Sequence, residues 1–146
     1  MTTYESDIKT ISSNEEVVFG LLSDLTNLEK LKDLPDAPKE LKEAEFDKDS
    51  CHIKVEGMGT VGFRIIDREP CKTIKFETEN LPMMKFDAWI QLKQVGENDT
   101  RMKLTLKADL PSMIKMMVDK KIKEGINTVA DVIAKAIENN STTKIS

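Results

Sequence analysis

Cys51 and His52 are the residues of this sequence best suited to chemistry, because a thiol beside an imidazole can form a nucleophile–base pair. His52 is the only histidine of the chain. However, the two residues lie in an alternating stretch typical of a strand, and neighbouring residues of a strand point to opposite faces. We therefore expect no Cys51–His52 dyad, and we expect His52 to face solvent.

A metal or cofactor site is not expected either. One histidine and two cysteines, Cys51 and Cys71, offer too few ligands for a structural zinc ion. The sequence has no phosphate-binding loop, no dinucleotide-binding glycine motif and no Gly-x-Ser-x-Gly motif. Catalytic residues are therefore left unassigned, and the sequence predicts a protein without a cofactor or a bound metal.

The composition is that of a single globular domain over residues 1–146. Hydrophobic residues make up 39% and charged residues 33% of the 146 residues, which is ordinary for a soluble protein with a sizeable core. The net charge of −4 argues against nucleic acid as a partner, because phosphate binding needs a concentrated basic face. The start of the chain does not resemble a secretory signal, and no apolar run is long enough to cross a bilayer. We expect a cytoplasmic protein with reduced thiols and no stable membrane insertion.

Alternating apolar and polar residues predict an antiparallel sheet of seven strands. The first strand is expected over Thr3–Ile11. Six further strands, separated by turns rich in Gly, Pro and Asn, are expected over Leu41–Phe46, Ser50–Glu56, Thr60–Glu69, Lys72–Glu79, Lys85–Val95 and Arg101–Leu110. The segment Leu41–Phe46 also suits a helix, because it is rich in Glu and Lys.

Two short helices are expected between the first strand and the other six. Ser13 and Glu16 fit a capping box at the start of the first helix. The second helix is expected to begin near Asp24, and Pro35 is expected to end it.

A long amphipathic helix is expected from Ser112 to Asn139, followed by a polar, frayed tail over 140–146. Its apolar stripe drifts around the helix axis, which predicts a bend over a curved sheet or a kink near Gly125. A glycine destabilises a helix interior by about 1 kcal/mol relative to alanine. We expect close approach of the helix to the sheet to compensate for it.

This order of elements resembles the helix-grip plan of the START-like (SRPBCC) superfamily, which includes birch pollen allergens, polyketide cyclases and lipid-transfer domains. The residues that carry the resemblance are Tyr4–Ser6, Asn14–Leu25, Ala88–Leu92 and Arg101–Leu106. The opening, with a Val-Phe pair in the first helix and Ser-Asp before the second, is similar to that of small bacterial members. The resemblance covers nearly the whole chain and includes no catalytic motif. It implies an α+β fold in which a strongly curved sheet wraps around the C-terminal helix.

The resemblance also implies a pocket between the concave face of the sheet and the long helix, holding an apolar small molecule or lipid. We expect eight residues to line it: Phe63, Ile65, Phe76, Phe86, Ile90, Leu104, Met113 and Met117. Methionine suits such a wall because its side chain is flexible and polarisable, and Met83 and Met84 are expected near the mouth. Lys121, Arg64 and Arg68 could orient a ligand carboxylate there. The alternative is that these residues simply fill a core.

Three functions are compatible with this plan. The inward-facing set is almost wholly apolar, with Tyr4, Ser6, Cys51 and Thr78 as exceptions, which favours binding or transport of a hydrophobic small molecule or lipid over catalysis. One alternative is a polyketide cyclase/dehydratase-like or hydrolase-like enzyme on the same scaffold. A second is a protein-interaction module with a filled core, in which Trp89 on the outer face anchors a partner or a homodimer. Alternatively, neighbouring long side chains cover Trp89, and it anchors no partner.

Overall fold

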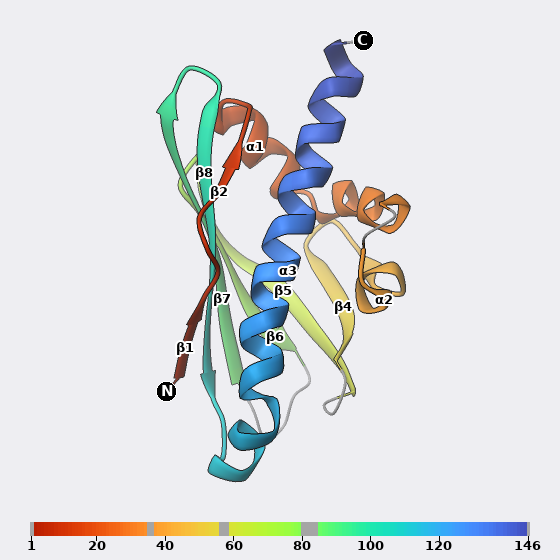
Figure 1. Ribbon diagram of the computed structural model, residues 1–146, viewed down its shortest axis with the longest axis vertical. Coiled ribbons are helices and arrows are strands. Elements are labelled where there is room, and N and C mark those ends of the chain that lie inside the picture. The colour runs from red at the N-terminus through yellow and green to blue at the C-terminus, as the bar shows by residue number, and fades with distance from the viewer. Residues whose placement is uncertain (1, 35–36, 56–58, 80–84, 146) are drawn as a thin grey trace.

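An eight-stranded antiparallel sheet curves around one side of a long C-terminal helix (Figure 1). The computed structural model describes residues 2–34, 37–55, 59–79 and 85–145. The strand order is β1-β8-β7-β6-β5-β4-β3, and β2 also pairs with β8. Strands that follow one another from β3 to β8 are neighbours in the sheet, as short connections require. This arrangement confirms the predicted α+β helix-grip fold.

The alternating part of the sequence forms the six strands of this meander. They are β3 (Glu45–Phe46), β4 (Ser50–Val55), β5 (Gly59–Glu69), β6 (Thr73–Glu79), β7 (Lys85–Gly96) and β8 (Asp99–Asp109).

The eighth strand arises because the predicted first strand is divided in two. Strands β1 (Thr2–Glu5) and β2 (Lys9–Ile11) both pair with β8. Between them the Ser6 hydroxyl accepts the Leu104 N–H at 2.9 Å, in place of a backbone carbonyl. The next backbone N–H, that of Asp7, donates to the side chain of Asn127 in the long helix at 2.6 Å. The regular ladder is therefore interrupted at this point.

The first two helices lie where the sequence predicts them, with a different cap on the first. Helix α1 (Glu15–Leu22) is capped by Asn14, whose side chain accepts the Val17 N–H at 3.0 Å, so the expected Ser13–Glu16 capping box is wrong by one position. The second is a 3-10 helix, η1 (Leu25–Asp33), which begins next to Asp24 as expected and is capped by the Asp24 side chain.

The predicted strand over Leu41–Phe46 joins the sheet only at its end. Its first two residues belong to the single turn of α2 (Lys39–Lys42), and its last two form β3. The high helix propensity of Glu and Lys accounts for this outcome.

Helix α3 (Ser112–Ile145) has 34 residues and lies along the concave side of the sheet, near β1, β2, β8 and η1 (Figure 1). It continues six residues beyond the predicted end at Asn139. The residues after Asn139 are only modest helix formers, but no glycine or proline stops the helix among them.

The apolar core falls into two clusters of buried residues. The larger one joins α1, η1, the middle of the sheet and the C-terminal half of α3, and it contains Leu22, Ile74 and Ile133. The smaller one, Tyr4, Phe86 and Ala108, lies toward the start of α3. Half-buried Phe63 and Ile126 pack against both clusters and connect them.

Candidate functional site

The concave face of the sheet brings together all six sheet residues predicted to line a pocket. Residues paired across antiparallel strands point to the same face, and Ile65 pairs with Phe76 while Ile90 pairs with Leu104. Five of the six are buried and one, Phe63, is half-buried. The complete set is Phe63, Ile65, Phe76, Phe86, Ile90 and Leu104. Their contact with a ligand stays a prediction.

Five apolar residues of this face and of α3 are only half-buried, although Phe86, Ala108 and Val118 nearby are buried. They are Phe63, Ala88 and Leu106 of the sheet and Ile122 and Ile126 of the helix. Ala88 and Leu106 are direct cross-strand partners, and all five pack against one or both core clusters. We refer to these five residues as the candidate site. It is an apolar surface that the protein does not bury completely by itself.

Gly125 leaves open space next to this site. It is half-buried and lies in the turn of α3 between Ile122 and Ile126. A Cβ atom added at Gly125 would meet no other heavy atom within 4 Å. The expectation that close helix–sheet approach compensates for this glycine is therefore wrong, since the space beside it is empty.

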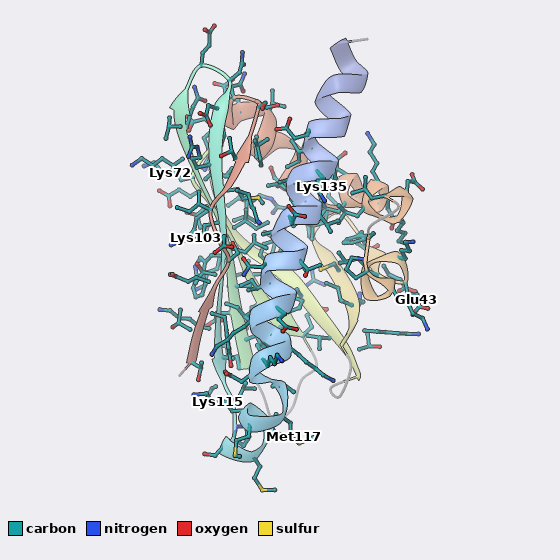
Figure 2. The ribbon with its side chains drawn as sticks, in the orientation of Figure 1. Glu43, Lys72, Lys103, Lys115, Met117 and Lys135 are labelled. Carbon is teal, nitrogen blue, oxygen red and sulfur yellow. The ribbon has the colours of Figure 1, made fainter. Side chains whose placement is uncertain are left out.

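Met113 and Met117 lie elsewhere than the sequence predicted. Their side chains are 79% and 72% exposed, whereas Ile114, Val118 and Ile122 form the face of α3 that turns toward the sheet. Residues four apart share one face of a helix, so these three exclude the two methionines from it. Figure 2 shows Met117 at the end of the molecule where α3 begins. The expected mouth residues Met83 and Met84 lie outside the described residues.

The Tyr4 hydroxyl is the polar group that joins β1 to α3 near the candidate site. It donates to Oδ1 of Asp119 at 2.7 Å, and Oδ2 of Asp119 is 3.0 Å from Nζ of Lys123. Burial, the hydrogen bond and the negative charge of Asp119 together raise the pKa of Tyr4 to about 12. The same hydrogen bond and that from Lys123 lower the pKa of Asp119. The pair is thus held as neutral phenol and ionised carboxylate.

The other inward polar side chains also serve the fold. The Ser6 hydroxyl donates to the Asp7 carbonyl at 2.9 Å while it accepts the Leu104 N–H. The Thr78 hydroxyl accepts the Phe86 N–H at 3.2 Å. Burial raises the pKa of the Cys51 thiol to about 12, so at neutral pH it is not the thiolate that a nucleophile requires.

His52 lies on the opposite face of the sheet from Cys51, as the alternation predicted. Its imidazole packs over Gly62, where a Cβ atom would be 3.1 Å from His52 Cδ2, and its Nε2 is 4.0 Å from Oε2 of Glu79. No Cys51–His52 dyad forms. Glu79 also pairs with Arg64, so this histidine belongs to a cluster of charged residues on the outer surface.

Trp89 on the outer face is covered by two lysine side chains. The Nζ atoms of Lys75 and Lys107 are 5.4 Å and 5.6 Å from the centroid of the indole ring. These distances are typical of cation–π contacts. The structure thus agrees with the covered alternative for Trp89, and a homodimer through this face stays a prediction.

Two of the three cations expected at the pocket mouth pair with residues elsewhere. Arg64 pairs with Glu79, and Arg68 pairs with Asp49 and donates to the Ser23 carbonyl at 2.8 Å. Lys121 is exposed on α3. The structure does not bring these three cations together.

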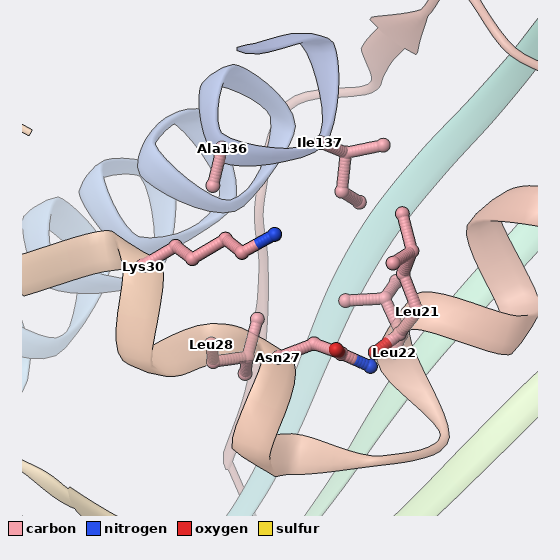
Figure 3. Close-up of a pocket in the computed structure, with 7 residues that line it drawn as sticks. All are labelled: Leu21, Leu22, Asn27, Leu28, Lys30, Ala136 and Ile137. Atoms are coloured by element: carbon pink, nitrogen blue, oxygen red, sulfur yellow. Dashed lines mark hydrogen bonds between the residues drawn. The ribbon is translucent and has the colours of Figure 1, made fainter. Parts of the chain in front are cut away.

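A small pocket lies at the other end of the molecule, between α1, η1 and the C-terminal half of α3 (Figure 3). Its volume of about 10 Å³ is close to the minimum that a single water molecule needs. Seven residues line it: Leu21, Leu22, Asn27, Leu28, Lys30, Ala136 and Ile137. A pocket of this size is a packing gap rather than a site for an organic ligand.

The described residues offer neither a metal site nor a membrane span. No three histidine, cysteine, aspartate or glutamate side chains among them come close enough together to hold a metal ion. Within the same ranges, no helix is both long and apolar enough to span a bilayer.

No family model and no curated protein matches this sequence. Solved structures do match its fold. A protein from Thermus thermophilus shares 17% identity with a TM-score of 0.67, covering 96% of this chain and 99% of that one. Norcoclaurine synthase from Thalictrum flavum, in complex with dopamine and hydroxybenzaldehyde, shares 16% identity with a TM-score of 0.68, covering 93% and 87%. A START superfamily protein from Mycobacterium smegmatis shares 12% identity with a TM-score of 0.56, covering 94% and 95%. The chain therefore has the START-like fold.

Proposed function

We propose that this protein binds a hydrophobic small molecule or lipid on the candidate site, beneath the first half of α3. The observation that carries the proposal is the incomplete burial of Ile122 and Ile126, beside a glycine where an added Cβ atom would meet no heavy atom within 4 Å. An apolar ligand placed there would remove this surface from water, which is favourable by about 25 cal/mol per Å² before association costs are subtracted.

The chemistry of the inward polar residues supports binding over catalysis. A general acid or base works best with a pKa near the operating pH, whereas the pKa values of Tyr4 and Cys51 are both raised to about 12. The hydroxyls of Ser6 and Thr78 are engaged with backbone groups. We therefore place the enzyme alternative second.

The comparison with norcoclaurine synthase is consistent with this proposal at the level of the fold. That protein was solved in complex with dopamine and hydroxybenzaldehyde. We infer from it only that a helix-grip domain can accommodate small organic molecules. The ligand of this chain is expected to be more apolar than dopamine or hydroxybenzaldehyde. The reason is that every residue of its candidate site is apolar: Phe63, Ala88, Leu106, Ile122 and Ile126.

Filling the space beside Gly125 tests the proposal. The change is Gly125→Leu, and the probe is an environment-sensitive hydrophobic dye whose fluorescence rises on binding. We expect saturable binding by the original protein and an affinity at least about tenfold lower in the variant, equivalent to about 1.4 kcal/mol. Leucine is a better helix former than glycine, so the variant should fold.

The matched control is Gly20→Leu in α1. A Cβ atom at Gly20 also meets no heavy atom within 4 Å, but Gly20 is exposed and belongs to another helix. This variant should bind the dye as the original protein does. Equal affinities in all three proteins would refute the proposal. Native mass spectrometry of freshly purified protein provides a second readout, because a retained ligand would add its mass.

A further inference from the structure

The start of α3 carries the most exposed apolar surface of the described residues. Met113, Met116 and Met117 are 79%, 85% and 72% exposed. Their spacing of three and four residues places them on one face of the helix. We call these three residues the methionine patch. It faces away from the candidate site, and Met117 lies at the end of the molecule (Figure 2).

This part of α3 is apolar on both of its sides. Ile114, Val118 and Ile122 turn toward the sheet, while the methionine patch turns toward solvent. A surface helix ordinarily presents charged and polar residues on its outer face. Single exposed apolar residues are common, but a contiguous exposed patch marks an interaction site.

Positive charge flanks the methionine patch. Residues 112–124 contain four lysines and two acidic residues, Asp119 and Glu124, a local charge of +4 − 2 = +2 in a chain whose net charge is −4. Lys115, Lys120, Lys121 and Lys123 are all exposed. Lys120 follows Met116 by four residues and Met117 by three, so it extends the same face. The aspartate, Asp119, is engaged by Tyr4 and Lys123.

We propose that the first turns of α3 dock onto the surface of an anionic lipid membrane. The methionine side chains would enter the boundary between headgroups and acyl chains, and the lysines would contact lipid phosphates, as in other interfacial helices. A second copy of the chain is the other occupant to consider. Symmetric pairing through this patch would set a charge of +2 against another of +2, which opposes association.

The methionine patch and the candidate site lie on opposite faces of α3, so docking would leave this helix between the site and the membrane. Ile122 and Ile126 follow Met117 by about one and a half and two and a half turns. The inference does not rest on the proposed function, because surface docking requires no ligand between the sheet and α3.

Vesicle flotation tests this inference on the full chain. The probes are vesicles of phosphatidylcholine alone and of phosphatidylcholine with about one third phosphatidylserine. We expect binding to the anionic vesicles that weakens as salt is added, and little binding to the neutral ones. Replacing the patch by Met113→Ser, Met116→Ser and Met117→Ser should lower the affinity at least about tenfold. The matched control replaces three other exposed apolar residues, Ile8, Ile66 and Val95, by serine and should bind normally.

Charge reversal at two positions tests whether the lysines near the methionine patch matter more than the net charge of the protein. Lys120→Glu with Lys121→Glu should weaken binding by about fivefold or more for each lysine. Lys48→Glu with Lys93→Glu, the same charge change at exposed positions on other elements, should weaken it much less. Equal binding by the methionine variant, or binding that does not depend on phosphatidylserine, would overturn the proposal.

A solution mass equal to two chains that returns to one in the methionine variant would also overturn it, in favour of a second copy. The methionine variant should still bind the dye, because its candidate site is intact. Dye binding therefore distinguishes a failure of the membrane proposal from a failure of the proposed function.

Discussion

The hydrogen bond between Tyr4 and Asp119 joins residues 115 positions apart and fixes the N-terminal strand to α3. The pKa of Tyr4 is raised from 10.0 in an ordinary tyrosine to about 12. A folded-state pKa above the unfolded value contributes stability that is complete below the unfolded pKa and is lost as pH rises through the folded one. We expect the free energy of unfolding to decrease between pH 10.0 and about pH 12 as Tyr4 loses its preference for the protonated form.

Tyr4→Phe tests this linkage directly. The variant should lower the free energy of unfolding near neutral pH by about 1 kcal/mol, typical of one lost hydrogen bond, and should remove the alkaline decrease assigned to Tyr4. Because Tyr4 is the only tyrosine, the ultraviolet absorbance of tyrosinate reports its titration alone. In Asp119→Asn the Tyr4 pKa should fall but stay above 10.0, since burial is the largest cause of the shift. A Tyr4 pKa that is already ordinary in the original protein would contradict this account.

At the residue scale, the sequence predicted which face a side chain points to better than it predicted which residue that side chain contacts. Alternation along strands placed Cys51 inward and His52 outward, because side-chain direction in a strand depends only on parity. The alternation could not reveal that Asp119 accepts a hydrogen bond from the Tyr4 hydroxyl, since that contact depends on how α3 lies against β1. The covering of Trp89 by Lys75 and Lys107 likewise depends on cross-strand register.

At the element scale, the N-terminus of α1 offers a test of the observed cap. Asn14→Ala should lower the free energy of unfolding by about 1 kcal/mol, because the Val17 N–H loses its side-chain acceptor. Denaturant unfolding at equilibrium measures the difference.

Glu16→Ala is the matched control for this cap. In the capping box suggested by the sequence, Glu16 would be as important as Ser13, whereas in the structure Glu16 is exposed in the first turn of α1. Its replacement should change stability by less than about 0.5 kcal/mol, the usual range for surface substitutions. A larger loss in the free energy of unfolding for Glu16→Ala than for Asn14→Ala would support the Ser13–Glu16 capping box instead.

The elements that the sequence placed correctly are those with long, regular patterns. Five strands of the meander and the start of α3 follow from periodicity and turn residues. The break between β1 and β2 depends on the Ser6 hydroxyl meeting Leu104, which periodicity cannot show. The outward position of Met113 and Met117 was missed for a related reason. Apolar residues on two faces of one helix do not indicate which face the sheet will cover.

At the scale of the whole molecule, α3 is more completely buried in its C-terminal half, where Ile133 and Ile137 are 4% and 3% exposed, than in its first half. A pocket of about 10 Å³ lies between α1, η1 and this C-terminal half. The end near the start of α3 has half-buried apolar residues and open space beside Gly125. The fold class and the inner face were predictable from the sequence. This uneven filling was not, because it results from how closely α3 approaches each part of the sheet.

Two identical substitutions in α3 measure this difference between the ends. Ile133 is 4% exposed in the larger cluster, whereas Ile122 is half-buried beside the smaller one. Ile133→Ala should lower the free energy of unfolding by about 2 to 5 kcal/mol, the range for a fully buried isoleucine. Ile122→Ala should lower it by less than about 2 kcal/mol, because part of its side chain already contacts water. Both values are measured by denaturant unfolding of ligand-free protein. Both substitutions replace an isoleucine of α3 by alanine, so they differ only in position. Equal losses at the two positions would mean that the core is filled evenly from end to end, and the candidate site would then be ordinary packing.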